Sequence, residues 1–192
     1  MAKSKQTVSF VDWLRTGLRK VALAHFVLLA AYAIQTIVLD AWDIVVPEVI
    51  MKRWLSAAAL LVVASAVWYI AHNRTEPLYR LRLYTFAVVI ADIIFAAYNV
   101  YIQRGVASKY VALFAIPLIV SALLLSRAAL YLTAFLSTAA YVAATVLYFT
   151  HYFNEAYKTE LYAEVGFYCA GFFVLAMVLG GLIRFGGDTD SR

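Results

Sequence analysis

The chain has 192 residues, of which 65% are hydrophobic and 14% charged, and its mean hydropathy is +0.83. A soluble domain is about half apolar and a quarter charged, so this composition excludes a soluble single-core protein. It also excludes a disordered chain, because disorder needs low hydrophobicity and high charge density. The single cysteine, Cys169, excludes a disulfide framework and a cysteine-based zinc site within one chain. The composition therefore predicts an integral membrane protein.

Six apolar stretches are long enough to cross the hydrocarbon core, which takes about 20 residues in a helix. In chain order they are Val21–Leu39, Trp54–Ala71, Leu83–Ile102, Tyr110–Ser126, Ala128–Phe153 and Val165–Ile183. The strand alternation of a membrane barrel is absent from these stretches. We therefore predict an all-α polytopic membrane protein, a bundle of six transmembrane helices with a short N-terminal amphipathic helix.

The N-terminal segment, residues 1–20, has apolar and basic residues on different faces of a helix. The apolar residues are Phe10, Val11, Leu14 and Leu18, and the basic ones include Arg15, Arg19 and Lys20. This pattern is typical of a helix that lies in the cytoplasmic interface; the alternative is a cationic arm that only sets topology. The transmembrane domain then covers residues 21–185. Residues 186–192 form a short cytoplasmic tail, and we expect the Gly186-Gly187 pair to end the last helix.

Few polar residues separate the fourth and fifth predicted spans. The run Tyr110–Phe153 has 44 residues, which as one helix would be about 66 Å long, more than twice the hydrocarbon thickness. We therefore predict that the chain folds back at Ser126-Arg127, where a charge can reach the interface. Pro117 lies inside the fourth span, and we expect it to kink that helix.

The distribution of Lys and Arg predicts the orientation. Eleven of the 16 Lys and Arg fall on the side that holds both termini, and the other five are Lys52, Arg53, Arg104, Lys109 and Lys158. Cytoplasmic loops carry the excess of positive charge. The sequence therefore predicts a multi-pass protein of the cell (inner or plasma) membrane. Both termini lie in the cytoplasm, and the expected partner is the lipid bilayer.

Asp92 is near the middle of the third span, where an ionised side chain costs about 2.5–3.5 kcal/mol. Thr85, Asp92 and Asn99 recur every seven residues and therefore share one helix face. One interpretation is a ligand or proton site, or a polar switch, in which Tyr141, Thr145 and Ser121 take part. The other interpretation is structural, with the Asp92 side chain hydrogen-bonded to one of these three hydroxyls.

Other candidate residues are fewer. His25 lies one turn inside the first span, where it is either a pH sensor or a hydrogen-bond partner of a neighbouring helix. The sequence has no metal-ligand spacing of His, Asp and Glu, no Gly-rich phosphate loop and no nucleophile motif. We therefore expect neither catalysis nor a metal, a cofactor or a nucleic-acid partner.

Small residues four apart mark faces where helices approach closely. In the last span these pairs are Gly166/Ala170 and Ala176/Gly180. Packing within one chain is the simpler interpretation, and a homodimer seam is the alternative. If the protein transmits a conformational signal, we expect it to leave through this last helix, which leads directly into the cytoplasmic tail.

Residues 79–150 carry a series of short motifs. They are Tyr79-Arg80-Leu81-Arg82-Leu83, Asp92, Tyr101, Arg104-Gly105-Val106-Ala107-Ser108, Leu113-Phe114-Ala115-Ile116-Pro117, Leu123-Leu124-Leu125-Ser126-Arg127, Thr133-Ala134-Phe135-Leu136-Ser137 and Tyr141. This series resembles the six-helix membrane input region of bacterial sensor histidine kinases. The sequence after Arg184 has no coiled coil, no phosphoacceptor histidine segment and no ATP-binding part, so the resemblance covers the sensor region without the kinase.

The resemblance implies a dimeric, non-enzymatic module that couples a membrane or small-ligand stimulus to a cytoplasmic kinase or other output partner. Both an excised sensor region and a stand-alone protein fit this expectation. Two alternatives remain open. One is a small-solute binding or transport subunit similar to the substrate-binding component of energy-coupling-factor transporters, and the other is a structural membrane scaffold.

Overall fold

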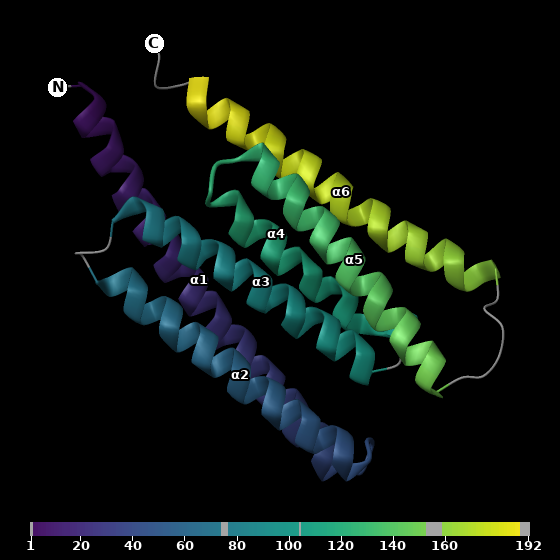
Figure 1. Ribbon diagram of the computed structural model, residues 1–192. Helices are drawn as coiled ribbons and strands as arrows, with labels where there is room; N and C mark the ends of the chain where they lie inside the picture. Colours follow the sequence, from purple (N-terminus) through teal and green to yellow (C-terminus); the bar gives the residue numbers. More distant parts are fainter. Residues whose placement is uncertain (1, 74–76, 104, 153–158, 189–192) are drawn as a thin grey trace. The chain divides into compact units, whose positions relative to one another are not determined.

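The computed structural model describes residues 2–73, 77–103, 105–152 and 159–188, and each of its secondary-structure elements in these ranges is a helix (Figure 1). The elements are α1 (Ala2–Ala41), α2 (Pro47–His72), α3 (Leu78–Ile102), η1 (Gly105–Ala107), η2 (Lys109–Phe114), α4 (Ala115–Ala122), α5 (Arg127–Tyr152) and α6 (Thr159–Asp188). The predicted all-α class is confirmed.

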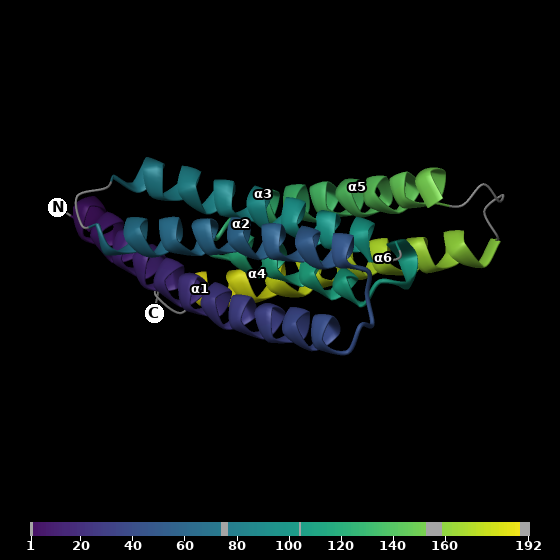
Figure 2. The ribbon, with the colours of Figure 1, turned by 90° about the horizontal axis from the view of Figure 1, so that it is seen from below.

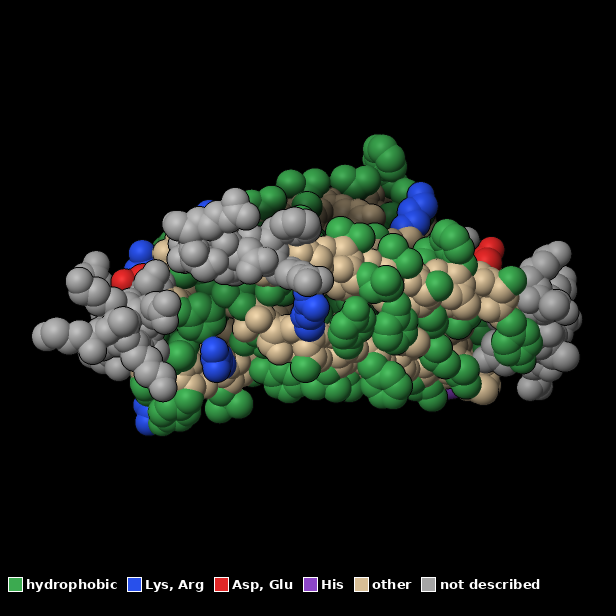
Figure 3. Space-filling view, turned by 90° about the horizontal axis from the view of Figure 1, so that it is seen from above, with side chains coloured by type: hydrophobic (Ala, Val, Ile, Leu, Met, Phe, Trp, Pro, Cys, Tyr) green, Lys and Arg blue, Asp and Glu red, His purple; other side chains and the backbone are tan. Residues whose placement is uncertain are grey.

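Five of the helices, α1, α2, α3, α5 and α6, are long and apolar enough to cross a membrane. Their outward-facing side chains are apolar as well: Val27, Val62 and Leu182 are each more than 60% exposed. Figure 3 shows hydrophobic side chains over much of the visible surface of the described residues. Because water does not stabilise such a surface and lipid does, the chain is a multi-pass membrane protein.

The fourth predicted span is shorter than expected and begins as a 3₁₀ helix. η2 rises about 2.0 Å per residue and α4 about 1.5 Å, so the apolar stretch Lys109–Ala122 is about 24 Å long. A hydrocarbon core is about 30 Å thick. Pro117 lies in the first turn of α4, where a missing N–H costs no helical hydrogen bond; the expected mid-helix kink is replaced by the change from 3₁₀ to α at Ala115.

The predicted fold-back before Arg127 is confirmed. α4 ends at Ala122 and α5 begins at Arg127. Leu125 takes the left-handed conformation (φ 49°) that glycine usually supplies in such a turn. The Ser126 Oγ accepts a hydrogen bond from the Ala129 N–H (3.3 Å) and so caps the start of α5.

Both ends of the chain differ from expectation. α1 runs without a break from Ala2 through residues 20 and 21, so the N-terminal segment continues into the first span and does not form a separate helix. α6 continues to Asp188, so the expectation that Gly186-Gly187 ends this helix is wrong. A helix already stabilised over many turns tolerates two glycines, which cost about 1 kcal/mol each.

The chain divides into two compact units, Met1–Val88 and Val89–Arg192. In the first unit, α1 and α2 form an antiparallel hairpin (Figure 1). In the second, α5 packs beside α6, and α4 contacts both of them. The pairing of α5 with α6 is visible in Figures 1 and 2.

A glycine is required where the second unit passes from α3 to η2. Gly105 has φ +60°, and a Cβ built on it would lie 2.9 Å from Cδ1 of Tyr148 on α5. Ser108 follows, and its Oγ accepts a hydrogen bond from the Tyr110 N–H (3.2 Å) at the start of η2. The sequence Gly105-Val106-Ala107-Ser108 therefore fixes a close turn against α5.

Candidate functional site

Polar side chains line one face of α5 in the second unit. Ser137, Tyr141 and Thr145 are four residues apart, so they lie one above another on the helix, and each is at most 1% exposed. We call these three residues the Tyr141 cluster. The sequence interpretation named Tyr141 and Thr145 but did not include Ser137, although the four-residue spacing is visible in the sequence.

Aromatic rings from two other elements hold the Tyr141 ring in place. The ring centroid of Phe114 on η2 lies 6.0 Å away, and those of Tyr168 and Phe172 on α6 lie 5.9 and 6.0 Å away. All three contacts are edge-to-face, an arrangement that aromatic quadrupoles favour. Tyr141 therefore joins η2, α5 and α6 through one side chain.

The hydroxyl groups of the Tyr141 cluster are enclosed but lack hydrogen bonds. The Ser137 Oγ, Tyr141 Oη and Thr145 Oγ1 atoms make no hydrogen bond of acceptable geometry with any described residue, although the Tyr141 and Thr145 hydroxyls lie close enough to interact with each other. More than about 90% of buried polar groups in proteins are hydrogen-bonded, and each one that is not costs about 1–3 kcal/mol. Three such hydroxyls on one helix face form a site that a water molecule or a polar ligand group would stabilise.

The polar residues predicted on the third span are all buried. Thr85 and Asn99 are fully buried and Asp92 is 4% exposed. Thr85 lies in the first unit and donates to the Leu81 carbonyl (2.8 Å); Asn99 lies in the second and donates to the Phe95 carbonyl (2.9 Å).

The structural interpretation of Asp92 expected a hydrogen bond from Tyr141, Thr145 or Ser121. For Tyr141 and Thr145 this expectation is wrong, because neither hydroxyl has a hydrogen-bond partner among the described residues. Ser121, which is fully buried on α4, donates to the Leu118 carbonyl (2.8 Å). Such local bonds to the carbonyl three or four residues back are the usual way for Ser and Thr to be satisfied in a helix.

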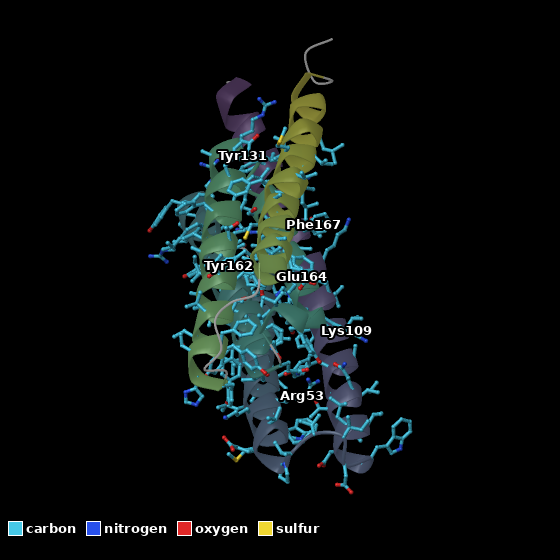
Figure 4. All side chains as sticks on the ribbon, turned by 90° about the vertical axis from the view of Figure 1, so that its right-hand side faces the viewer. Arg53, Lys109, Tyr131, Tyr162, Glu164 and Phe167 are labelled. Carbon is cyan, nitrogen blue, oxygen red and sulfur yellow. The ribbon has the colours of Figure 1, made fainter. Side chains whose placement is uncertain are left out.

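A groove of about 270 Å³ lies beside the Tyr141 cluster. Residues of η2 and α4 form one wall, and residues of α6 form the other; the lining includes Lys109, Ala112, Phe167, Tyr168, Gly171 and Phe172. Lys109 and Phe167 are labelled in Figure 4. Tyr168 and Phe172 belong both to this wall and to the ring contacts of Tyr141. Its two walls come from residues 108–115 and 167–175, so no local pattern in the sequence predicts the groove.

In the first unit the largest fully buried side chain is Arg53 on α2. Its Nε donates to Thr36 Oγ1 (3.0 Å), its Nη2 donates to Gln35 Oε1 (3.1 Å), and its guanidinium lies 4.4 Å from the centre of the Tyr32 ring. The Tyr32 and Ser56 hydroxyls are 2.9 Å apart, and Ser56 also donates to the Arg53 carbonyl (2.9 Å). We call these five residues the Arg53 network; it ties α1 to α2.

Arg53 was expected in an outer connector, but it lies inside α2. The signal that was missed is Pro47. Proline favours the first position of a helix, and α2 begins there, so Arg53 lies in the second turn. A guanidinium in an apolar surrounding is stabilised by hydrogen bonds and by an aromatic face, and α1 supplies both.

His25 is 2% exposed on α1, and its Nδ1 donates to the Val21 carbonyl (2.8 Å). This bond lies within its own helix. Its proposed role as a pH sensor stays a prediction. Among the described residues, no group of three or more His, Cys, Asp or Glu side chains is placed to hold a metal ion.

The two small-residue pairs of α6 have different surroundings. Gly166 and Ala170 are exposed, and a Cβ on Gly166 would meet nothing within 4 Å, so the expected packing of this pair is not found among the described residues. Ala176 is fully buried, and a Cβ on Gly180 would lie 3.9 Å from Arg127 Cγ and Leu130 Cδ1 of α5. The second pair is therefore where α6 approaches α5.

Comparison with models of known protein families, with curated proteins and with solved structures gives no match to this chain. The resemblance to the input region of sensor histidine kinases rests on the motifs between residues 79 and 150 and stays a prediction.

Proposed function

We propose that the chain is a six-span signal-input module of the inner or plasma membrane, with both termini in the cytoplasm. In this proposal η2 and α4 form the remaining span, which a locally thinner bilayer accommodates. The module passes a membrane or small-ligand stimulus to a cytoplasmic kinase or other output partner.

The observation that carries this proposal is the set of enclosed hydroxyls in the Tyr141 cluster. In a static bundle these hydroxyls would lower stability unless buried water satisfied them. In a module with two states the hydroxyls gain partners in one state, either from a bound polar group or from a rearranged neighbour. A stimulus that favours one arrangement then shifts the population between the two.

The route from the cluster to the cytoplasm follows α6. Tyr168 and Phe172 contact the Tyr141 ring, and further along the same helix Ala176 and Gly180 lie against α5. A helix moves as a rigid element, so a shift of the rings at Tyr141 is passed on to the C-terminal end of α6. The exposed Gly166 and Ala170 support a homodimer seam on another face of this helix.

A thermal-shift screen of the purified protein against vitamins, amino acids and quinones tests the first half of the proposal. We expect at least one compound to raise the melting temperature of the wild type but not that of Tyr141→Phe, which keeps the ring packing and removes the hydroxyl. No stabilising compound, or one that stabilises the two proteins equally, would contradict the role of the cluster.

Cross-linking tests the second half. Single cysteines at positions 178 to 182 are introduced into a Cys169→Ala background and cross-linked in membranes with and without the stabilising compound. We expect the cross-linking pattern to change on binding. Binding with an unchanged pattern would favour the solute-binding alternative, and a C-terminal alkaline phosphatase fusion that is active would contradict the cytoplasmic location of the terminus.

A further inference from the structure

The groove between η2 and α6 has three properties that together define a class of ligand. It lies between a span-forming helix and the apolar η2–α4 segment, its walls are apolar, and a charged side chain lies at its rim. The charged residue is Lys109, which is exposed and forms no ion pair with a described residue.

The size of the groove limits what it holds. Pockets for drug-sized molecules measure about 300–1,000 Å³ and enclose most of the ligand, whereas this groove measures about 270 Å³ and opens along α6. A groove of this volume accommodates one segment of a longer, narrow molecule. Gly171 leaves its floor open, because a Cβ there would meet nothing within 4 Å.

We propose that the groove binds one acyl chain of an anionic membrane phospholipid, with the lipid phosphate next to Lys109. The acyl chain lies along Ala112, Phe167 and Phe172, where it covers apolar surface that would otherwise contact bulk lipid. The Lys109 ammonium supplies a point charge for the phosphate.

The groove also lies next to the Tyr141 cluster. Tyr168 and Phe172 line the groove on one side and contact the Tyr141 ring on the other. An acyl chain in the groove is therefore separated from the enclosed hydroxyls by one layer of rings. Lipid binding itself does not depend on the proposed signalling function, and only its use as a stimulus rests on that function.

Native mass spectrometry of the delipidated full-length protein tests the proposal. The probes are phosphatidylglycerol, which is anionic, and phosphatidylcholine, which has the same chains and no net charge. We expect one phosphatidylglycerol per chain to bind saturably and at least several-fold more tightly than phosphatidylcholine. Two lipids that bind equally and without saturation would overturn the proposal.

Substitutions locate the site. Gly171→Leu fills the groove, and we expect it to weaken phosphatidylglycerol binding at least ten-fold. Gly181→Leu is the matched control, because a Cβ on Gly181 would also meet nothing within 4 Å, and Gly181 lies on the same helix and does not line the groove; it should bind like the wild type. Lys109→Gln should bring the affinity for phosphatidylglycerol down to that for phosphatidylcholine and leave the latter unchanged.

Two further outcomes are decisive. If Gly171→Leu lowers the melting temperature strongly, Ala112→Leu fills the groove from the opposite wall and should reproduce the loss of binding. If either groove-filling variant binds lipid like the wild type, the proposal is wrong. If instead these variants lose a dimer peak that the wild type shows, the groove is an interface between two copies of the chain and the lipid assignment is overturned.

Discussion

The first unit and the second unit both bury polar side chains among apolar helices, but they leave them in different states. In the first unit the Arg53 guanidinium is held by Thr36, Gln35 and the face of Tyr32. In the second unit the hydroxyls of the Tyr141 cluster are enclosed without hydrogen bonds. Burial alone therefore does not distinguish a structural polar group from a candidate site, whereas the hydrogen bonds do.

The difference also separates what each unit does. The Arg53 network connects α1 to α2 by interactions that are already complete, so it makes the hairpin more stable and more specific. The Tyr141 cluster joins three elements by ring packing and keeps unused hydrogen-bonding capacity. A region of the second kind is where a ligand or a rearrangement lowers the free energy most.

The largest expected effect is the loss of the Arg53 network. Arg53→Met keeps an unbranched side chain like the aliphatic stem of arginine but removes the charged hydrogen bonds to Thr36 and Gln35. Each hydrogen bond to a charged group contributes about 1.5–3 kcal/mol. We expect the free energy of unfolding to fall by about 2–3 kcal/mol, less than the sum of the two bonds, because methionine avoids the cost of burying a charge; the measurement is titration with sodium dodecyl sulfate and circular dichroism.

The neighbouring Lys52→Met is the matched control for Arg53→Met. Lys52 is partly exposed and forms an ion pair with Glu48 one turn earlier (2.6 Å), and ion pairs of this kind contribute little. A drop for Lys52→Met as large as that for Arg53→Met would contradict the structural role of the network.

Gly105→Ala should cause the next largest loss of stability. A non-glycine residue in the left-handed region costs about 1–2 kcal/mol, and the added Cβ would lie 2.9 Å from Tyr148 Cδ1. We expect a loss of at least about 1–2 kcal/mol in the same titration. Gly181→Ala in α6 meets nothing within 4 Å and should leave stability unchanged or raise it, because alanine favours a helix; equal effects of the two substitutions would argue against the strained turn.

Removal of the cap on α5 should have a smaller effect. Ser126→Ala deletes the acceptor for the Ala129 N–H, and loss of such a cap costs about 1 kcal/mol. Thermal melting of the purified protein should show a modest decrease. Ser65→Ala, at an exposed position within α2, should melt like the wild type, and a decrease there of the same size would remove the support for capping.

Hydrophobicity and length were enough to predict the helical class, the apolar parts of the five long helices and the fold-back before Arg127. The seven-residue spacing of Thr85, Asp92 and Asn99 was enough to predict a buried face. These features depend on residues close together in the sequence. The short fourth span was not predictable in the same way, because hydropathy does not distinguish a 3₁₀ segment from an α-helix.

The candidate site depends on residues far apart in the sequence. The groove brings Lys109 next to Phe167, and the Arg53 network brings Arg53 next to Tyr32. Periodicity within one helix carries no information on such pairs. The hydrogen bonding of Tyr141 is even less predictable from the sequence, because it depends on atomic distances and angles between packed helices.

The most direct test makes the same chemical change in each unit. Tyr32 and Tyr141 are both at most 4% exposed, but the Tyr32 hydroxyl lies 2.9 Å from Ser56 Oγ whereas the Tyr141 hydroxyl makes no hydrogen bond of acceptable geometry with a described residue. Hydrogen bonds between membrane helices contribute about 0.6 kcal/mol on average. In side-by-side unfolding titrations without added ligand, the account predicts that Tyr32→Phe is destabilised by about this amount and that Tyr141→Phe is as stable as the wild type or more stable. A Tyr141→Phe variant that is destabilised as much as Tyr32→Phe would contradict it.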